Sequence, residues 1–545
     1  MTASKKRGAD ALIRSLQQAG VKRIFTLSGN HIMPLFDAAF EAGIELIHTR
    51  HEAATVHMAD AYARITGEPG IALVTGGPGH ANAVSALYTA QMAESAVVLL
   101  SGHAPNNQLG MGAFQEMRQA EMAAPVTKLS WTSASANVLA SDMAKAISTA
   151  QSGRPGPVHL SLPTDALEST TDASNAVIDA SAFQSVAMPF STTDAATFLA
   201  RLSRAKRPLI LTGPASLTRF RRDQLAALEA ATGIAVIGME SPRGIGDPSL
   251  GAFAQVLALS DCVLLLGKRL DFTLKFGAVP AFAADCEFLQ IDAEKNEIER
   301  SRRAVASRLI ATAQADTPSA IRALIAASQS AVKADSAWRA DVHAAINFRP
   351  DAWNQATSSI ADRLHPVQAL RPLQALLDSH PDSVFISDGG EIGQWAQACL
   401  KAPHRVINGV AGAIGAALPF ALAARLAVPD APIIAVMGDG TFGFHTAEMD
   451  TAVRYGLPFL AVVGNDARWN AEYQIQLRDY GRDRLIGCEL LPARYDQVTS
   501  AFGGHGEYVT SADALMPAAQ RAIASGKPSC VNVMIEGLAA PNIRR

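Results

Sequence analysis

Short runs of hydrophobic residues alternate with longer amphipathic stretches along most of the chain. In the first part, the runs 23–29, 71–77 and 157–163 have the length and β-branched content of strands. The intervening stretches 51–67 and 80–95 have the periodicity of helices. Because this alternation is typical of parallel sheets whose strands are joined by helices, the pattern predicts an α/β fold.

The same alternation occurs in three blocks separated by two breaks. The segment 165–191 is rich in Ser, Thr, Ala and Asp, and the segment 306–366 is helical and polar, so we interpret both as connectors. Further strands are predicted at 207–213, 234–239, 262–268, 287–293, 383–390, 433–440, 459–466 and 529–536. We therefore predict three doubly wound parallel-sheet domains, near residues 1–170, 190–340 and 365–535, followed by a tail, 536–545, that we interpret as a candidate lid.

Composition and charge narrow the class of protein. Charged residues make up 18% of the chain, below the roughly 25% of a typical soluble protein, which favours surface hidden in a subunit interface or a deep site. The net charge of −3, with mixed signs, argues against binding of nucleic acid or of an anionic membrane surface. Five scattered cysteines, the lack of an apolar signal core and a longest apolar run (409–424) too short to span a bilayer favour a cytoplasmic enzyme.

Candidate metal ligands follow two predicted strands of the third block. One strand ends in Gly438-Asp439-Gly440, and the next ends at Asn465 after a strand–helix–strand interval. Since the carboxyl ends of parallel strands share one edge of a sheet, the Asp439 carboxylate and the Asn465 amide are expected side by side. With the Ala467 carbonyl they would form a hard-oxygen set for Mg²⁺ beside glycines that let a phosphate approach. Gly-Asp-Gly also forms ordinary turns, so the prediction of a metal site depends on the presence of Asn465 at this spacing.

Three other segments contain candidate site residues. Glu52 follows a strand and begins a helix, where it is either a general acid/base or a charge favoured by the helix dipole. The segment 72–82 nearly matches a dinucleotide-binding fingerprint, but Asn82 replaces the third glycine and the next strand lacks a terminal acid, so an NAD site is the weaker reading. The glycine-rich segment 408–419 fits either a flat ligand or a structural helix start.

Taken together, these motifs resemble thiamin-diphosphate-dependent enzymes of the acetolactate synthase, oxalyl-CoA decarboxylase and benzaldehyde lyase group. The resemblance covers nearly the whole chain. It is carried by Glu52 in its strand–helix context and by the segments 76–79 (GGPG), 112–116 (GAFQE), 153–158 (GRPGPV), 412–415 (GAIG) and 438–465 (GDG…N), in this order. The last motif is the most specific of the set.

The resemblance implies a role for each matching residue. Asp439, Asn465 and the Ala467 carbonyl would hold Mg²⁺ on the cofactor diphosphate, and Glu52 would protonate a ring nitrogen of the cofactor. The residues implied to contact thiamin diphosphate are Gly390, Glu391, Gly412, Ile414, Gly438, Gly440, Thr441 and Asn465. In this family Glu52 and Asp439 come from different subunits, which implies a homodimer or homotetramer with its sites at the subunit interface.

Some positions depart from the commonest family pattern. Asp466 stands where a second asparagine is usual. Asn30, His31, His80 and Gln115 place polar groups where they are expected to face the reacting carbon, unless they are satisfied surface residues. The segments 27–36, 267–272 and 464–476 resemble bacterial 2-hydroxyacyl-CoA lyases, which would cleave a 2-hydroxyacyl-CoA to a carbonyl compound and formyl-CoA.

The central block contains charged residues near strand ends that suit a nucleotide. Arg243, Lys268, Arg269 and Asp292, with Glu489 from the third block, are candidates for contact with the substrate, ADP or FAD, although solvated loop charges explain them equally well. The substrate is expected to be a small molecule, a CoA thioester. The alternatives are an acetolactate synthase or related 2-oxo acid decarboxylase, a non-catalytic regulatory relative, and, more weakly, an NAD dehydrogenase.

Overall fold

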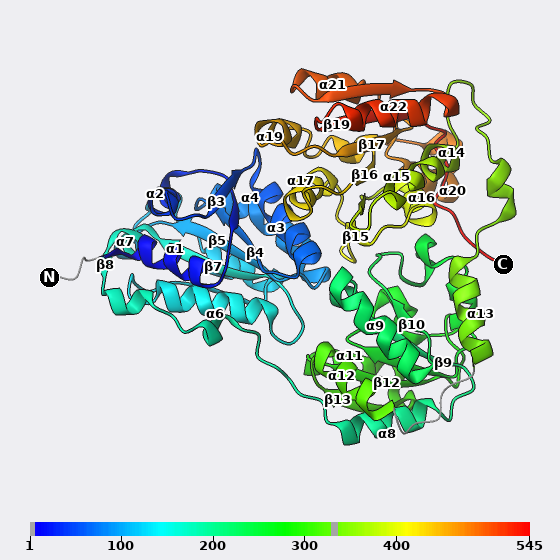
Figure 1. Cartoon of the computed structure of the whole chain (residues 1–545), viewed down its shortest axis with the longest axis horizontal. Coiled ribbons are helices and arrows are strands. Elements are labelled where there is room, and N and C mark those ends of the chain that lie inside the picture. Colours follow the sequence, from blue (N-terminus) through cyan, green and yellow to red (C-terminus); the bar gives the residue numbers. More distant parts are fainter. Residues whose placement is uncertain (1–5, 329–335) are drawn as a thin grey trace. The chain divides into compact units, whose positions relative to one another are not determined.

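The computed structural model describes residues 6–328 and 336–545, and it contains three parallel sheets (Figure 1). The predicted fold class, three α/β domains with parallel sheets, is confirmed. The described chain divides into two compact units. The first runs to Val186 and includes the short segments 422–427 and 450–455, while the second holds the remainder, with both the central and the C-terminal sheet.

The sheet of the first unit has the strand order β3-β2-β4-β5-β7-β6. Its strands are β2 (Arg23–Thr26), β3 (Glu45–His48), β4 (Gly70–Val74), β5 (Val97–His103), β6 (Leu129–Thr132) and β7 (Val158–Pro163). A two-stranded antiparallel pair is formed by β1 (Lys6–Arg7), before the first helix of this unit, and β8 (Thr170–Thr171), after its last strand. The helices are α1 (Gly8–Gln18), α2 (Met33–Ala39), α3 (Glu52–Thr66), α4 (Pro78–Met92), α5 (Gln119–Ala123), α6 (Leu139–Gln151) and α7 (Thr164–Glu168).

Local sequence explains where the two central helices of this unit begin and end. The His51 ring accepts a hydrogen bond from the Ala53 amide at 3.1 Å and so caps the start of α3, which ends at Gly67 in the left-handed conformation. Helix α4 begins at Pro78, directly after Gly77 with φ +59°. Proline suits the first helical position because it lacks the N–H that would otherwise be unpaired there.

The central sheet has the order β10-β9-β11-β12-β13. Its strands are β9 (Pro208–Thr212), β10 (Val236–Gly238), β11 (Cys262–Leu266), β12 (Glu287–Asp292) and β13 (Leu309–Gln314), and its helices are α8 (Thr192–Leu202), α9 (Arg219–Thr232), α10 (Phe253–Leu257), α11 (Lys295–Val305), α12 (Thr317–Ser328) and α13 (Ser336–Asn347). Leu209 and Leu211 belong to one hydrophobic cluster and Ile210 to another. Because successive side chains of a strand point to opposite faces, helices cover both faces of this sheet.

The segment 306–366, interpreted as a connector, contains strand β13 and helices α12 and α13, which correct that interpretation. The strand was overlooked because it lies at the edge of the sheet and most of its residues are only half-buried. A half-buried edge strand has little of the continuous apolar character by which a central parallel strand is recognised.

The C-terminal sheet has the order β15-β14-β16-β17-β19-β18, with all pairs parallel. Its strands are β14 (Val384–Ser387), β15 (His404–Ile407), β16 (Ile433–Gly438), β17 (Leu460–Asn465), β18 (His505–Val509) and β19 (Ser529–Met534). Its helices are α14 (Pro366–Leu370), α15 (Gln374–Asp378), α16 (Glu391–Cys399), α17 (Ala417–Ala427), α18 (Asp439–Phe442), α19 (Glu448–Arg454), α20 (Asn470–Asp479), α21 (Tyr495–Ala501) and α22 (Ala512–Ala524).

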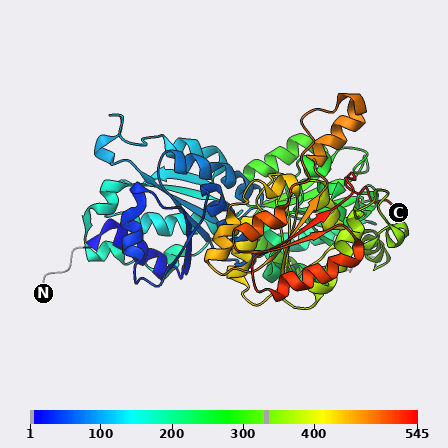
Figure 2. The ribbon, with the colours of Figure 1, turned by 90° about the horizontal axis from the view of Figure 1, so that it is seen from above.

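Strand β16 lies between β14 and β17, so the loops that follow these three strands meet at one edge. In Figure 2, helix α20 and the segment that follows it (orange) stand out from the C-terminal sheet. In the described part of the chain, no helix combines the length and the apolar character needed to cross a membrane.

The C-terminal tail packs against helices of the second unit. The carbonyl of Ala539 accepts a hydrogen bond from the Trp395 indole at 3.0 Å, and the carbonyl of Leu538 accepts one from the Asn470 amide at 3.0 Å. At the end of the chain, the Arg545 guanidinium lies 2.8 Å from Asp341. The tail therefore runs beside α16 and α20 before it reaches α13 of the central sheet, and its role as a lid stays a prediction.

Candidate functional site

A cavity of about 200 Å³ lies at the edge where β14, β16 and β17 end. It brings together most of the residues implied to contact a cofactor. Its lining includes Gly390, Glu391, Gly412, Ile414, Gly438, Asp439, Gly440 and Thr441, together with Arg243 from the central block. Asn465 and Ala467 lie outside the lining, whereas Asp466 lies within it.

Two glycines keep this cavity open. Gly390 has φ +82°, a conformation that residues with a side chain rarely adopt, and a Cβ there would meet no atom within 4 Å. A Cβ at Gly440 would fall 2.5 Å from the Trp469 ring. Because neither glycine has a side chain, the backbone at both positions is accessible to a ligand. Such backbone is suited to close approach by a phosphate group.

Asp439 is a buried carboxyl group on the lining of the cavity, at the start of α18. Its side chain is 2% exposed, and its Oδ2 atom has no hydrogen-bond partner among the described residues. Burial raises the pKa of the Asp439 carboxyl to about 6, against the opposing effect of nearby backbone N–H groups. A buried carboxylate oxygen without a partner is costly unless a cation or donor pairs with it.

Asp466 provides a second carboxyl group on the same cavity. It is 6% exposed. Burial, and then the charge of Asp439, raise its pKa to about 8, while Arg468 and Arg363 act in the opposite direction. The two carboxyl groups thus affect each other electrostatically, and a cation between them would relieve their repulsion.

The side chain of Asn465, predicted as a metal ligand, points away from the cavity. Its Nδ2 donates to the Ala493 carbonyl at 3.0 Å and to Asn532 Oδ1 at 3.1 Å. Its Oδ1 accepts a hydrogen bond from the Ala467 amide at 3.2 Å, and the Ala467 carbonyl in turn accepts one from Leu490 at 2.7 Å. Asn465 is the last residue of β17, and neighbouring positions of a strand face opposite sides, which is why Asp466 is the one that reaches the cavity.

An ion pair joins the cavity to the central block. Arg243 Nη2 donates to Glu391 Oε2 at 3.0 Å. Burial raises the pKa of the Glu391 carboxyl, and the charge of Arg243 opposes this shift. Arg243, considered above for a nucleotide, therefore lies at the same cavity as Asp439.

In the first unit, the structure groups Glu52 with the loop after β4. Its Oε2 atom accepts a hydrogen bond from the Asn82 amide at 3.0 Å. A Cβ at Gly79 would lie 3.4 Å from Glu52 Oε1 and 2.8 Å from the Thr75 side chain. The Gly-Gly-Pro-Gly segment therefore passes close to this carboxyl group because it has no side chain at that point.

His31 and Gln115 lie beside the same loop. His31 Nδ1 is 3.2 Å from Thr75 Oγ1, and its ring stacks on Phe114 with centroids 5.9 Å apart. Burial lowers the pKa of His31, which favours the neutral imidazole. A Cβ at Gly77 would fall 2.7 Å from that of Gln115. Asn30 is exposed at the start of the short helical turn that contains His31.

His80 lies in the core. It is 0% exposed, its Nδ1 is 2.8 Å from Ser101 Oγ, and its ring centroid is 4.5 Å from that of His159. Burial lowers its pKa to about 4. A fully buried, neutral histidine beside strands β5 and β7 favours a structural role over contact with a substrate.

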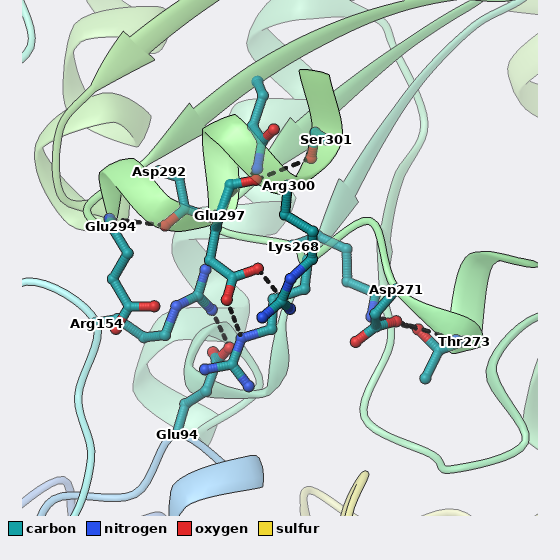
Figure 3. Close-up of polar contacts among 12 residues, drawn as sticks. Glu94, Arg154, Lys268, Asp271, Thr273, Asp292, Glu294, Glu297, Arg300 and Ser301 are labelled. Carbon is teal, nitrogen blue, oxygen red and sulfur yellow. Dashed lines mark hydrogen bonds and ion pairs between the residues drawn. The ribbon is translucent and has the colours of Figure 1, made fainter. Parts of the chain in front are cut away.

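The charged residues predicted at the central sheet contact their own neighbours (Figure 3). Lys268 is 2% exposed and its Nζ donates to Thr273 Oγ1 at 2.7 Å. Asp292 is 1% exposed and accepts a hydrogen bond from the Glu294 amide at 3.0 Å, while Arg269 lies 3.6 Å from the carboxylate of Glu297.

Glu489 lies apart from this group, exposed in the segment after α20, where it forms a β-bridge with Arg468. The arrangement around Lys268 and Asp292 favours a structural role for these charges. Three further residues line the cavity at the start of α20 and are not among those predicted from the sequence: Trp469, Asn470 and Glu472. Their position just after Asp466 was the available signal.

Comparisons with known proteins agree with these features. Three family models match the chain: "Thiamine pyrophosphate enzyme, N-terminal TPP binding domain" over residues 6–122, the central domain of the same enzymes over 195–323, and "Thiamine pyrophosphate enzyme, C-terminal TPP binding domain" over 388–533.

Curated relatives cover almost the whole chain. The chain is 32% identical to the acetolactate synthase large subunit IlvG of Mycobacterium tuberculosis, over 96% of this chain and 95% of that protein. It is 30% identical to 2-hydroxyacyl-CoA lyase 2 of Danio rerio, over 98% and 92%, and 28% identical to oxalyl-CoA decarboxylase of Escherichia coli, over 97% and 95%.

Proposed function

Since the chain belongs to the thiamine pyrophosphate enzyme family, we propose that it binds thiamin diphosphate and Mg²⁺ and acts as a 2-hydroxyacyl-CoA lyase. The observation that supports the cofactor site is the cavity at the carboxyl ends of β14, β16 and β17, with its open glycine backbone and the Oδ2 atom of Asp439, which has no hydrogen-bond partner in the described structure. The proposed lyase activity is supported by the relatives that carry that name.

The residues of the cavity fit a metal bound through a diphosphate. Asp439 supplies a buried carboxylate oxygen, and oxygen ligands are those that Mg²⁺ prefers. No cluster of three or more His, Cys, Asp or Glu suited to a metal occurs within residues 6–328 and 336–545, so protein side chains there do not form a complete cage. Mg²⁺ commonly takes its remaining ligands from substrate phosphates and water, which is what a diphosphate-bound ion requires.

The other residues of the cavity would orient the cofactor. The backbone at Gly390 and Gly440 would contact the diphosphate, and Thr441 would lie beside it. Gly412 and Ile414 would contact the ring system. When bound, thiamin diphosphate supplies a carbanion-stabilising ring next to the reacting carbon. The ion pair of Arg243 and Glu391 would hold the rim of the cavity in place.

Glu52 would hold the proton on the pyrimidine ring nitrogen of the cofactor. We propose that Glu52 of one copy of the chain serves the cavity of a second copy, so that a homodimer is the smallest active unit. His31, Asn30 and Gln115, which surround the loop after β4 or lie next to it, would then border the substrate. His31 would act as a neutral hydrogen-bonding group, since burial lowers its pKa.

In the proposed reaction, the bond between the hydroxyl-bearing carbon and the thioester carbonyl breaks. The hydroxyl carbon leaves as an aldehyde or ketone after losing its hydroxyl proton, and the thioester carbon gains a proton and leaves as formyl-CoA. No external oxidant or reductant is required. An acetolactate synthase is the second candidate, supported by the relatives of that name at 32% identity.

The test is to incubate the purified protein with thiamin diphosphate, Mg²⁺ and a panel of 2-hydroxyacyl-CoAs, and separately with pyruvate, and to follow products by mass spectrometry. The proposal expects formyl-CoA and the matching carbonyl compound, with no turnover when thiamin diphosphate is omitted. Acetolactate without formyl-CoA would support the second candidate. Turnover of neither substrate class would indicate a non-catalytic relative.

Exchanging Glu52 for Gln tests its role as proton partner. We expect Glu52→Gln to lower kcat by about 10²-fold or more, because the amide does not supply the proton. Glu45→Gln is a suitable control, since Glu45 lies exposed on β3 of the same unit. Unchanged kcat in Glu52→Gln would remove Glu52 from the mechanism.

A further inference from the structure

We infer that Asp388 and Asn408 are positioning residues for the segment 409–416, and that they fix the orientation of the two peptide groups on either side of Ile414. Asp388 directly follows β14, and Asn408 directly follows β15. The inference rests on the proposed function, because Ile414 is one of the residues proposed to contact the ring system of thiamin diphosphate. It names the side chains that hold this contact in place.

The Asp388 carboxyl group accepts hydrogen bonds from backbone N–H groups. Its Oδ1 accepts from the Gly389 amide at 2.6 Å and from the Gly415 amide at 3.0 Å. Its Oδ2 accepts from the Gly415 amide at 3.0 Å and from the Ala417 amide, at the start of α17, at 2.9 Å. Asp388 is 1% exposed; burial raises the pKa of its carboxyl, and the N–H groups oppose that shift. These bonds require two accepting oxygens, which an amide side chain does not have.

Asn408 bonds to the same segment on the other side of Ile414 in the sequence. Its Nδ2 donates to the Ala413 carbonyl at 2.9 Å. This bond also assigns the two ends of the Asn408 amide, since exchanging them would place Oδ1 against a carbonyl oxygen. A Cβ at Gly389 would collide with the Ile414 side chain, so that side chain packs directly on the backbone that follows Asp388.

The two peptide groups that flank Ile414 are each held at one end by these side chains. A peptide group is planar and trans, so its C=O and its N–H point in opposite directions. The Ala413 carbonyl is bonded to Asn408, and the Ile414 N–H of the same peptide group therefore points away from Asn408. The Gly415 N–H is bonded to Asp388, and the Ile414 carbonyl therefore points away from Asp388. Ile414 thus keeps one backbone orientation, which suits a residue that contacts a flat ring.

A cap of helix α17 is the simpler role for Asp388. Its carboxyl group bonds to the Ala417 amide at the start of that helix, and such caps contribute to stability. A cap alone would not distinguish one ligand of the cavity from another. A positioning role acts on the ring end of the ligand, because the diphosphate end is proposed to contact Gly390 and Gly440 instead. The two roles therefore differ in which ligand loses affinity.

Three variants test the inference. Asp388→Asn keeps the size of the side chain but turns an NH₂ group toward N–H donors. Asn408→Ala removes the bond to the Ala413 carbonyl and provides a second measurement if the first variant does not fold. Ser387→Ala is the matched control, because Ser387 is 0% exposed on the same strand and its hydroxyl donates to the Gly393 carbonyl of α16 at 2.9 Å. Circular dichroism and thermal unfolding would establish which variants are folded.

Hydrogen exchange of the full-length protein without cofactor, followed by mass spectrometry, measures how firmly the segment is held. In Asp388→Asn the N–H groups of Gly415 and Ala417 should exchange about tenfold faster than in the wild type, because each loses a buried acceptor. Asn408→Ala should also accelerate exchange within 409–416. Ser387→Ala should change exchange in this segment by less than about threefold.

Calorimetry then measures two affinities in Mg²⁺, those for thiamin diphosphate and for inorganic pyrophosphate, which lacks the ring system. Asp388→Asn and Asn408→Ala should each bind thiamin diphosphate about tenfold more weakly than the wild type. Their affinity for pyrophosphate should change by less than about threefold. Ser387→Ala should leave the ratio of the two affinities as it is in the wild type.

The outcomes separate this inference from the proposed function. If exchange in the folded variants matches that in Ser387→Ala, or if thiamin diphosphate and pyrophosphate lose affinity in the same proportion, the inference is wrong while the proposed cofactor stands. If the wild type binds no thiamin diphosphate in Mg²⁺, the proposed function fails and the inference fails with it, even where exchange shows that Asp388 and Asn408 hold the segment.

Discussion

The central and the C-terminal sheet both place charged residues at the carboxyl ends of their strands, but the contacts of Lys268 and Asp292 differ from those of Asp439. At the central sheet, Lys268 and Asp292 are 2% and 1% exposed and make short contacts with their own neighbours. At the C-terminal sheet, Asp439 is equally buried but keeps an oxygen without a partner in the described structure.

The two edges also differ in the space around the glycine that follows a strand. A Cβ at Gly267, after β11, would fall 2.3 Å from the Thr317 hydroxyl, so the space above that strand end is already filled by the chain. A Cβ at Gly390, after β14, would meet nothing within 4 Å. A charge at the end of a strand is therefore a weak indicator of a site. An unsatisfied buried polar group beside open glycine backbone is a stronger one.

The largest effect is expected from the unpartnered carboxylate itself. Asp439→Ala removes the buried oxygen proposed to bind the cation, and we expect kcat/KM to fall by about 10³-fold or more. Thiamin diphosphate binding in Mg²⁺, measured by calorimetry, should be lost in parallel. Asp292→Ala is the matched change at the central sheet, and it should lower the melting temperature but preserve binding of thiamin diphosphate. Equal loss of binding in both variants would contradict the distinction between the edges.

Much of this arrangement was predictable from sequence because local patterns determine it. The runs before Gly390, Asp439 and Asn465 are apolar and flanked by glycine, and they became neighbouring strands whose ends share an edge. The helices expected at 51–67 and 80–95 are present as α3 and α4. Such features depend on residues close together in the chain.

The remainder depends on contacts between distant residues. A shift of one position at a strand end turns a side chain to the other face, and the hydrogen bonds of Asn465 with Ala493 and Asn532 join segments that lie far apart in the sequence. His80 became a core residue because Ser101 and His159 come from the sheet beneath it. The docking of Arg545 on Asp341 likewise joins segments far apart in sequence.

Two buried histidines of the first unit also have polar atoms without a partner. In the described structure the Nε2 atoms of His80 and His159 lack hydrogen-bond partners, although both rings lie in the core. Burial lowers the pKa of His80 to about 4, and burial also lowers the pKa of His159 well below its ordinary value. In the unfolded chain these groups have a pKa of about 6.5 and bind protons more readily. The contribution of these two histidines to stability should therefore be fully present above pH 6.5 and should be lost as the pH drops toward about 4, by roughly 3 kcal/mol for His80 alone.

Denaturant unfolding at pH 7, 6 and 5 would measure this loss. His80→Gln should flatten the pH dependence, since the amide does not titrate. His505→Gln is the control, because His505 is half-buried on an edge strand and its Nε2 lies 2.9 Å from Glu507 Oε1. An unchanged slope in His80→Gln would assign the acid sensitivity elsewhere. The result would also distinguish two kinds of buried polar atom that lack a partner in the described structure. The Nε2 atom of His80 lies in the core and is expected to affect stability, whereas the Oδ2 atom of Asp439 lies on a cavity and is expected to affect binding.

A smaller effect is expected from closing the glycine backbone of the cavity. Gly440→Ala places a methyl group 2.5 Å from the Trp469 ring, which must then shift within the lining. We expect the affinity for thiamin diphosphate in Mg²⁺ to fall by about tenfold. In the double variant Gly440→Ala/Trp469→Leu, the methyl group no longer collides with a ring. The affinity of the double variant for thiamin diphosphate should therefore equal that of the single variant Trp469→Leu. Additive losses in the double variant would indicate that Gly440 acts through the phosphate and not through the ring.

The smallest effect is expected at the central sheet, where a nucleotide would have to displace contacts that the chain already makes. Lys268 would exchange its bond with Thr273, and Asp292 its bond with the Glu294 amide, for new partners of similar strength. We therefore expect ADP or FAD at about 1 mM to raise the melting temperature by less than about 1 °C, whereas thiamin diphosphate with Mg²⁺ raises it by several degrees. Flavin or ADP retained in the purified protein, detected by absorbance and mass spectrometry, would show that this edge opens to a ligand. The unpartnered Asp439 oxygen would then no longer distinguish a binding edge from a structural one.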